Sequence, residues 1–338
     1  MWYRGTLLAE TTTCDSISED GQRIGALPVP NQPNLGYQRS GSVWTARKRS
    51  PRLVTHVLRL FDSKIVSFEF FPPKTDSGKE KLISVAKTFK KISAEYFSVT
   101  FGAGGSTKAG TLETCVELYN STKTLTVPHI SGIGSTKEDI KDILDEYVEL
   151  GFKRLMVLRG DLPSGFGPIG EFSYAIDLIN FIREHYENYF YIGVGAYPEV
   201  HPEALNAEED LNYFVEKVNA GANGAVTQFF YDPSSYIDFI NECNKKGVTT
   251  AITPGIMPIK NKDSLIRMSK SCGAKLPNSL VSKLSEFDNE EDITKFGIDY
   301  VTGLCQELLD NEAPGLHFYT INQIEPTKKI VESLKLDS

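Results

Sequence analysis

The sequence predicts a (β/α)8 barrel, a single large α/β domain. The chain has 338 residues, of which 40% are hydrophobic and 24% are charged, which is the composition of an ordinary globular protein. From Ile65 onward, eight short β-type runs alternate with segments of helical periodicity. Eight such units over about 270 residues match a closed barrel better than an open doubly wound sheet.

Eight apolar runs are expected to form the strands. The first ends at Pro72-Pro73, because proline supplies no backbone donor to a strand ladder. The expected strands are Ile65–Phe71, Tyr96–Phe101, Thr124–Ile130, Arg154–Leu158, Tyr191–Tyr197, Ala225–Phe230, Thr250–Pro254 and Gly315–Tyr319.

Capping residues and glycines mark the helices between these strands. The last crossover, roughly Leu265 to Leu309, is longer than the others and is expected to hold two helices. Three earlier helices are expected to begin at a cap and end at a glycine: Ser135 with Glu138 to Gly151, Asn206 with Glu209 to Gly221, and Asp232-Pro233 to Gly247.

Residues 1–62 are expected to form a disordered N-terminal arm, and residues 63–338 the barrel domain. The arm contains a threonine run, a proline-rich stretch and the basic cluster Arg47-Lys48-Arg49, without sustained apolar periodicity. Its beginning lacks the apolar core of a secretory signal, and its acidic residues weaken any similarity to a transit peptide. A cytoplasmic location is the default expectation.

Charge and cysteine content point to small-molecule partners. The net charge of −8 argues against a nucleic acid held by general electrostatics, and no apolar run approaches the roughly 18 residues of a membrane helix. The five cysteines are scattered without a CxxC pair, so neither a zinc site nor a disulfide framework is indicated. No histidine or carboxylate spacing typical of another metal site occurs either.

Glu69 interrupts the apolar run near the end of the first expected strand. Because Phe68, Phe70 and Phe71 flank it in sequence, its carboxylate is expected to be poorly solvated. Poor solvation favours the protonated form, which suits a general acid. The alternative is a structural glutamate at a strand end, reaching solvent or an arginine.

The chemistry of a (β/α)8 barrel gathers at the C-terminal ends of its strands. Taken singly, a residue such as His129 or His201 is more often structural, and Arg159 with Asp161 could form a loop ion pair. The glycine clusters lack the spacings of Rossmann and P-loop phosphate sites. The other strand ends are nevertheless polar or aromatic: Thr100 to Ser106, His129, Arg159 to Pro163, Tyr197 to Ala204, Gln228 to Phe230, Pro254 to Pro258, and His317 to Tyr319.

Eight segments at or near these strand ends carry a family likeness: SFEFFPPK, SVTFGAGGST, VPHISG, LRGDLP, AYPEVHPEA, AGANGAVTQFFYD, PGIMPI and GLHFYTIN. In this order they resemble the methylenetetrahydrofolate reductases, over about residues 64–335. The resemblance implies a flavin-bearing (β/α)8 barrel in which NADH or NADPH drives conversion of 5,10-methylenetetrahydrofolate to 5-methyltetrahydrofolate, a step of one-carbon metabolism and methionine supply. Without the C-terminal regulatory region of the animal and plant enzymes, the chain looks like the short bacterial type. The family also suggests a homo-oligomer.

The resemblance further implies roles for individual residues. The proton donor falls on Glu69, and Asp161 falls on a catalytic position that borders both the flavin ring and the folate. Substrate contacts fall on Asp161, Gln228 and Gln323, and a nicotinamide contact falls on Thr100. FAD contacts fall on Phe101, Ala103, His129, Arg159, Gly160, Asp161, Tyr174, Ala175, Tyr197, His201, Ala204, Asp210 and Lys217.

Two positions depart from the family pattern. After PGIMPI, where relatives commonly have an aromatic residue, this chain reads Lys260-Asn261-Lys262 and has no aromatic residue before Phe287. At Gln323 the family has an arginine that contacts substrate. Substrate affinity, or the way the substrate tail is held, is therefore expected to differ.

Two other classes of function stay open at this point. A cofactor-free barrel lyase or aldolase is possible because fold does not fix function, but it would need a Schiff-base lysine or a metal cluster at the strand ends. A non-catalytic flavin- or folate-binding barrel would leave Glu69 without a role. The reductase resemblance instead predicts two half-reactions, with Glu69 protonating the folate in the second.

Overall fold

The computed structural model describes residues 64–92, 94–101, 108–160, 170–334 and 336. The expected N-terminal arm, the domain boundary near residue 62, and the site residues Ala103 and Asp161 lie outside the described residues. The barrel itself falls within them.

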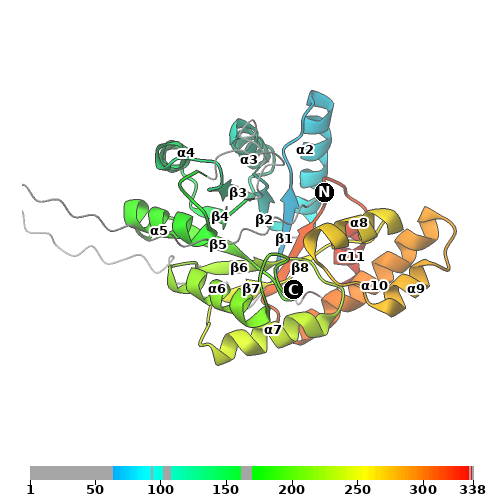
Figure 1. Cartoon of the computed structure of the whole chain (residues 1–338). Helices are drawn as coiled ribbons and strands as arrows, with labels where there is room; N and C mark the ends of the chain where they lie inside the picture. Colours follow the sequence, from blue (N-terminus) through cyan, green and yellow to red (C-terminus); the bar gives the residue numbers. More distant parts are fainter. Residues whose placement is uncertain (1–63, 93, 102–107, 161–169, 335, 337–338) are drawn as a thin grey trace, which may run out of the picture. The chain divides into compact units, whose positions relative to one another are not determined.

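The described strands form one parallel sheet in the order β7-β6-β5-β4-β3-β2-β1-β9-β8. β7 and β8 are consecutive pieces of a single segment, and they pair with β6 and with β9 respectively. The sheet therefore closes into the predicted barrel (Figure 1). The strands are β1 (Ile65–Phe70), β2 (Ala94–Val99), β3 (Leu125–Ser131), β4 (Arg154–Leu158), β5 (Tyr191–Ala196), β6 (Gly224–Thr227), β7 (Ala251–Thr253), β8 (Gly255–Ile256) and β9 (Gly315–Tyr319).

The expected strand Thr250–Pro254 corresponds to β7, and a second piece, β8, follows it beyond Pro254 where no strand was expected. Pro254 has no amide hydrogen and interrupts the ladder, although its carbonyl still accepts a hydrogen bond of 3.0 Å from the His317 amide. The break lets the two pieces turn toward different neighbours. This is how one segment joins both open edges of the sheet.

Helices surround the sheet (Figure 1). The last crossover holds three helices, α8 to α10, where the sequence led us to expect two. The described helices are α2 (Asp76–Lys91), α3 (Lys108–Thr122), α4 (Lys137–Glu149), α5 (Ala175–Tyr186), α6 (Ala207–Asn219), α7 (Pro233–Lys245), α8 (Lys262–Cys272), α9 (Asn278–Leu284), α10 (Glu290–Asp310) and α11 (Thr327–Ser333).

Most predicted caps are confirmed, and one is shifted. Asn206 caps α6 by accepting from the Glu209 amide, and Asp232 caps α7 with Pro233 in its first turn. The expected capping box at Ser135 and Glu138 is wrong by one residue, because Thr136 and Asp139 form it instead. Both pairs have the same spacing and chemistry, so the pattern locates the helix start without distinguishing them. The predicted terminal glycines Gly151, Gly221 and Gly247 all have positive φ.

Side chains along β1 alternate between the core outside the sheet, where the helices pack, and the interior of the barrel. Val66, Phe68 and Phe70 are buried between the sheet and its helices. Phe68 stacks on Phe89 of α2 with ring centroids 4.2 Å apart. The interior is itself packed in part, because Val127, Met156 and Val226 form a separate buried cluster against Tyr96, Leu158 and Tyr319.

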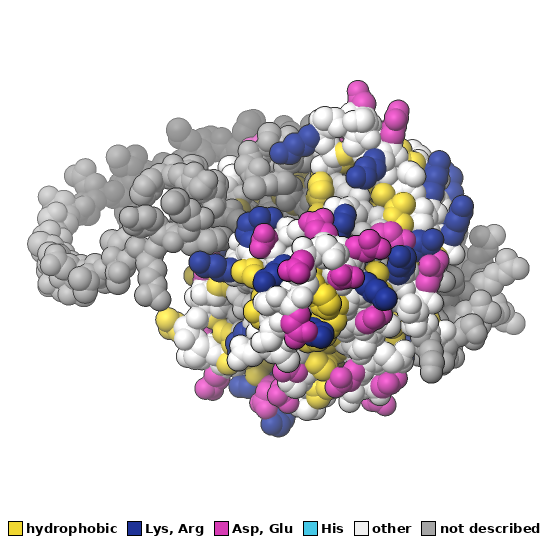
Figure 2. Space-filling model, turned by 90° about the vertical axis from the view of Figure 1, so that its right-hand side faces the viewer, with side chains coloured by type: hydrophobic (Ala, Val, Ile, Leu, Met, Phe, Trp, Pro, Cys, Tyr) yellow, Lys and Arg dark blue, Asp and Glu magenta, His cyan; other side chains and the backbone are white. Residues whose placement is uncertain are grey.

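Charges on the surface are mixed in sign. Figure 2 shows lysine, arginine, aspartate and glutamate side chains interspersed over the face that includes α8 to α10. Within the described ranges, no helix has both the length and the apolar character needed to cross a membrane.

Candidate active site

Glu69 lies at the C-terminal end of β1 and faces the barrel interior. Its side chain is 18% exposed, so one side of it reaches the mouth of the barrel. The Glu69 carbonyl accepts hydrogen bonds from the Thr320 hydroxyl (2.7 Å) and the Thr320 amide (3.4 Å). Its backbone is therefore fixed to the end of β9, which limits movement of the carboxylate.

The expected phenylalanine environment of this carboxylate is wrong. Phe68 and Phe70 adjoin Glu69 in sequence, but the pleat of β1 points them to the opposite face, against Phe89 of α2. Phe71 follows the strand and is 44% exposed. The partners of Glu69 come from other strands of the barrel instead.

His317 is one of these partners; it was placed at a polar strand end by the sequence analysis but was not predicted as a site residue. Its Nε2 lies 3.6 Å from the Glu69 carboxylate, and the side chain is fully buried. Its Nδ1 lies 2.7 Å from the Ser67 hydroxyl, and Nε2 lies 3.4 Å from the Ser98 hydroxyl. The ring also stacks on Tyr96, with centroids 5.9 Å apart. The available signal was its position between Leu316 and Phe318, whose outward-facing side chains leave His317 facing inward.

His129, predicted to contact flavin, is the second partner. Its Nε2 is 3.5 Å from the Glu69 carboxylate, and only 5% of the side chain is exposed. Burial lowers the pKa of His129 to about 4, opposed by the charge of Glu69 and reinforced by His317. The imidazole is therefore neutral at pH 7. Within the described part of the chain its buried Nε2 has no hydrogen-bond partner, so it can accept or donate toward a group that enters beside Glu69.

We call this set of residues, on the inward faces of β9, β1, β2 and β3, the acid wall. It consists of Glu69, His129, His317, Ser67 and Ser98. Ser67, Ser98 and His317 are fully buried and position one another, and the partly exposed Glu69 carboxylate lies beside them, 3.6 Å from His317.

A charged cluster forms where β4 and β5 end. Arg159 pairs with Glu203 at 2.5 Å (Nη1 to Oε2), and the Glu203 amide donates to His201 Nδ1 at 3.1 Å. The His201 amide donates to Asp210 at 2.8 Å. Burial lowers the pKa of His201 and raises that of Asp210. The predicted Arg159, His201 and Asp210 are thus brought together, with Asp210 supporting the His201 loop.

Lys217 of α6 joins the same region. Its ammonium donates to the Gly195 carbonyl at 2.6 Å and lies 5.6 Å from the centre of the Phe214 ring. Burial lowers the pKa of Lys217 to about 8, with Asp210 acting in the opposite direction. An ammonium held at some cost in desolvation is a site that an anion stabilises.

Glycines lie in the barrel wall next to these cations. A Cβ on Gly193 would touch Met156 at 3.5 Å, and one on Gly195 would touch Leu158 at 3.8 Å, so both face the interior. Gly160 has φ +90°, and a Cβ there would lie 1.9 Å from the Ser131 hydroxyl. Gly160 thus packs against Ser131, whereas Gly193 and Gly195 leave the interior open at their positions; we call the inward faces of β4, β5 and β6, with Gly193 and Gly195, the glycine wall.

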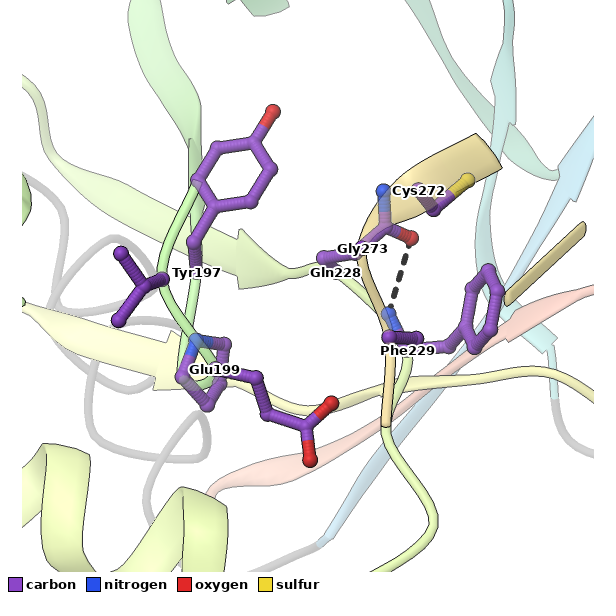
Figure 3. Close-up of a pocket in the computed structure, with 9 residues that line it drawn as sticks. Tyr197, Glu199, Gln228, Phe229, Cys272 and Gly273 are labelled. Atoms are coloured by element: carbon purple, nitrogen blue, oxygen red, sulfur yellow. Dashed lines mark hydrogen bonds between the residues drawn. The ribbon is translucent and has the colours of Figure 1, made fainter. Parts of the chain in front are cut away.

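A small pocket opens between the β5 loop, the end of β6 and the end of α8 (Figure 3). Tyr197, Glu199, Gln228, Phe229 and Cys272 are among its lining residues. The Gln228 side-chain oxygen accepts a hydrogen bond of 3.0 Å from the Phe229 amide, which leaves the amide NH2 as a donor. Glu69 does not line this pocket.

The remaining predicted residues lie around the same mouth. Thr100 donates its amide to the Phe70 carbonyl at 2.9 Å, immediately beyond Glu69, and Phe101 follows it. Ala204 donates to the His201 carbonyl at 3.0 Å, and Tyr174 precedes α5, which begins at Ala175. Gln323 accepts from Lys260 at 2.8 Å.

Fold and site together define a (β/α)8 barrel with a buried acid opposite a cationic, glycine-lined wall. The chain belongs to the methylenetetrahydrofolate reductase family, whose model matches residues 55–335.

Two curated relatives show how far the likeness extends. The chain is 37% identical over 270 residues to methylenetetrahydrofolate reductase (NADH) 1 of Arabidopsis thaliana, a match covering 76% of this chain and 46% of that protein. It is 34% identical over 270 residues to the 5,10-methylenetetrahydrofolate reductase of Pectobacterium carotovorum subsp. carotovorum, covering 80% of this chain and 89% of that protein. The chain thus spans about half the length of the plant relatives and most of the bacterial one.

One solved structure supports the fold. It is a Clostridium thermocellum protein described as uncharacterized and as binding two copies of 5-methyl-5,6,7,8-tetrahydrofolic acid. It matches with a TM-score of 0.58 and 14% identity, over 83% of this chain and 96% of that one.

Proposed function

We propose that this protein reduces 5,10-methylenetetrahydrofolate to 5-methyltetrahydrofolate with electrons from NADH or NADPH, carried by a bound FAD. The observation that carries the proposal is the position of Glu69 between two buried histidines, at the mouth of a barrel that belongs to this family. The printed names of the relatives in Arabidopsis and Pectobacterium support the same activity. A small-molecule enzyme of this kind fits a cytoplasmic location.

The residues of the glycine wall suit a flavin dinucleotide. Lys217 and Arg159 offer donors to a pyrophosphate, and His201 offers a ring edge whose orientation is set by Glu203. Gly195 leaves the adjacent backbone open to close approach by a planar ring, because nothing lies within 3.8 Å of where its Cβ would be. Tyr174, 61% exposed, and Ala175 would complete the site at the start of α5.

When bound, the flavin supplies hydride transfer between nicotinamide and folate. The chain supplies the proton. We assign to Glu69 the protonation of the folate ring nitrogen, which opens the five-membered ring. Because His129 is neutral, it places no positive charge beside the Glu69 carboxylate. His317, held by its contact with Ser67, orients that carboxylate. Asp161, proposed to act beside the flavin and the pterin, lies outside the described residues.

Gln228 and Thr100 complete the proposed assignment. The side-chain NH2 of Gln228 can donate to the pterin. Thr100 is the residue after β2, and its amide bonds to the last residue of β1, at the mouth where nicotinamide and folate would enter in turn. Both ligands then use one mouth of the barrel. The two half-reactions would alternate.

Purified protein tests the proposal. We expect a yellow preparation whose flavin absorbance is bleached anaerobically by NADH or NADPH and restored by methylenetetrahydrofolate, with methyltetrahydrofolate as the product. Bleaching without restoration would indicate a flavoprotein with another acceptor. A protein that takes up no flavin would overturn the proposal.

One observation favours a second candidate, a lyase that uses a Schiff base. The pKa of Lys217 is lowered to about 8, which is the property that such a lysine needs. Its ammonium, however, belongs to α6 rather than to a strand end and donates to the Gly195 carbonyl. Borohydride trapping with carbonyl substrates, read by mass spectrometry, would reveal a modified Lys217 if this candidate were correct.

A further inference from the structure

Of the two departures from the family pattern, the aromatic position falls on Lys262 and the arginine position on Gln323, and it is the nearby Lys260 that meets Gln323 in space. Lys260 follows β8 and Gln323 follows β9, 63 residues later, and the Lys260 ammonium donates to the Gln323 side-chain oxygen at 2.8 Å. An ammonium can only donate, so the amide atom that faces it is the oxygen. The contact joins two loops at the C-terminal rim of the barrel, the rim at which β1 ends with Glu69.

Both loops are held by the framework. The Gln323 amide donates to the Thr320 carbonyl at 3.0 Å, and the Thr320 hydroxyl donates to the Glu69 carbonyl at 2.7 Å. Asn322, between them, bonds to the Phe71 amide at 3.0 Å and to the Phe71 carbonyl at 2.9 Å. Gln323 is therefore fixed relative to the proposed proton donor.

The Lys260 loop is held from the other side. The Lys260 carbonyl accepts from the Thr294 hydroxyl of α10 at 3.2 Å. Gly297, one turn further along α10, allows Ile259 to approach so closely that a Cβ would lie 2.5 Å from the Ile259 carbonyl oxygen. The backbone from which the Lys260 side chain extends is thus held by packing, and the ammonium is placed by its bond to Gln323.

The Lys260–Gln323 pair keeps hydrogen-bond donors that no described residue uses, and it carries a net positive charge. Because the Gln323 oxygen is occupied by Lys260, its amide NH2 remains, together with two further hydrogens of the ammonium. Among the described residues Lys260 forms no ion pair, so its charge is not compensated by a carboxylate. Such an arrangement fits an ionised carboxylate, which only accepts hydrogen bonds.

We propose that Lys260, positioned by Gln323, binds a carboxylate of the glutamyl tail of the folate substrate and is a specificity-determining residue of this protein. The inference rests on the proposed function. It places the cation of the tail site on the β8 loop, while the β9 loop contributes a neutral amide.

Calorimetric titration of the flavin-loaded protein tests this with two ligands, 5-methyltetrahydrofolate and the same compound with both tail carboxylates converted to amides. Lys260→Ala should weaken binding of the acid about 5- to 20-fold and leave binding of the diamide within about twofold, because one charge-assisted contact is lost only with the acid. Lys260→Arg should keep most of the affinity. Lys262→Ala is the matched control, because that ammonium bonds to the Ser285 hydroxyl at 2.9 Å, away from Gln323.

A compensating variant sharpens the test. If the site needs one cation near either loop, the double variant Lys260→Ala with Gln323→Arg should recover binding of the acid. Equal affinity of the parent and Lys260→Ala for the acid, in a protein that still turns over methylenetetrahydrofolate, would overturn the inference and leave the proposed function standing. A parent protein that neither binds nor reduces folate would instead overturn the proposed function, and the inference with it.

Discussion

The acid wall and the glycine wall of the barrel are built on opposite principles. The acid wall is filled with polar side chains that bond to one another, including His317 to Ser67 at 2.7 Å. In the glycine wall the inward side chains Met156, Leu158 and Val226 are apolar, Gly193 and Gly195 have no side chain, and the polar groups Arg159 and Lys217 stand at the edge. We infer from this difference that the acid wall serves the proposed proton transfer and the glycine wall the proposed binding of an anionic flavin dinucleotide.

The comparison also explains why the two walls tolerate change differently. Buried polar groups in the acid wall depend on partners, so removing one leaves another unsatisfied. Positions in the glycine wall have room for a methyl group at Gly193 and Gly195, at 3.5 and 3.8 Å from the nearest atoms. Variants in the acid wall should therefore affect chemistry and stability together, whereas alanine at Gly193 or Gly195 should affect ligand affinity alone.

The largest expected effect is that of Glu69→Gln. The amide keeps the shape of the side chain but cannot donate a proton as an acid, so reoxidation of the flavin by methylenetetrahydrofolate should fall by about 10²–10⁴-fold. Reduction by nicotinamide should stay within about tenfold of the parent, because that step takes no proton from Glu69. Stopped-flow measurement of both half-reactions provides the check. Equal loss in both halves would mean that Glu69 shapes the flavin site, and no loss in the folate half would make it structural.

Lys217→Ala should have the next largest effect, in the glycine wall. If Lys217 makes the proposed charge-assisted contact to the pyrophosphate, its loss should cost about 1.5–3 kcal/mol, or roughly ten- to hundredfold in FAD affinity. Titration of apoprotein with FAD measures this. Unchanged affinity combined with lost turnover would show that Lys217 acts in the chemistry and not in binding.

The pH dependence of FAD binding examines the same residue without mutation. The pKa of Lys217 is lowered to about 8 without a ligand, and a bound anion raises it by favouring the charged form. FAD affinity should therefore be constant below about pH 7.5 and should fall as the pH rises above 8. In Lys217→Arg, which stays charged, this fall should disappear; a fall of the same size there would assign it to another group.

Ser67→Ala, in the acid wall, should have an effect of intermediate size. It removes the hydroxyl 2.7 Å from His317 Nδ1 and leaves a buried ring nitrogen without its partner, at a cost of about 1–3 kcal/mol in unfolding free energy. With His317 less constrained, the folate half-reaction should slow about three- to tenfold. Ser98→Ala is the control, because its contact with Nε2 is 3.4 Å and should matter less. Equal effects of the two variants would show that the short contact has no special role.

Gly195→Ala should have a smaller effect, and on binding only. A Cβ meets nothing closer than 3.8 Å, and alanine restricts the unfolded chain, so the melting temperature should hold or rise slightly. FAD affinity should fall about two- to fivefold, because the methyl group occupies space on the glycine wall. A drop in melting temperature without a change in affinity would contradict the division between the two walls.

Deletion of residues 1–62 should have the smallest effect. The predicted arm carries none of the residues assigned to either wall, so flavin content and turnover should stay within about twofold. Absorbance and steady-state assays of the truncated protein decide this. An insoluble or colourless product would show that the arm completes the fold or the site.

The sequence by itself determined the barrel class, the approximate positions of its strands and most of the helix ends that it predicted. These follow from local rules: apolar runs form strands, a capping side chain such as Asn206 begins a helix, and a glycine such as Gly221 ends it with a positive φ that other residues rarely adopt. The strand-end location of Glu69 was readable for the same reason, because Pro72-Pro73 ends the ladder just beyond it.

Only the tertiary structure decided what surrounds Glu69. Its sequence neighbours Phe68 and Phe70 point away, and its actual neighbours, His129 and His317, come from strands 60 or more residues distant. The same holds for Lys260 and Gln323, which lie 63 residues apart in the sequence and which the fold brings into contact. Period-two alternation fixes which face a side chain takes, but closure of the barrel fixes which strands share that face, and closure depends on pairings across the whole chain.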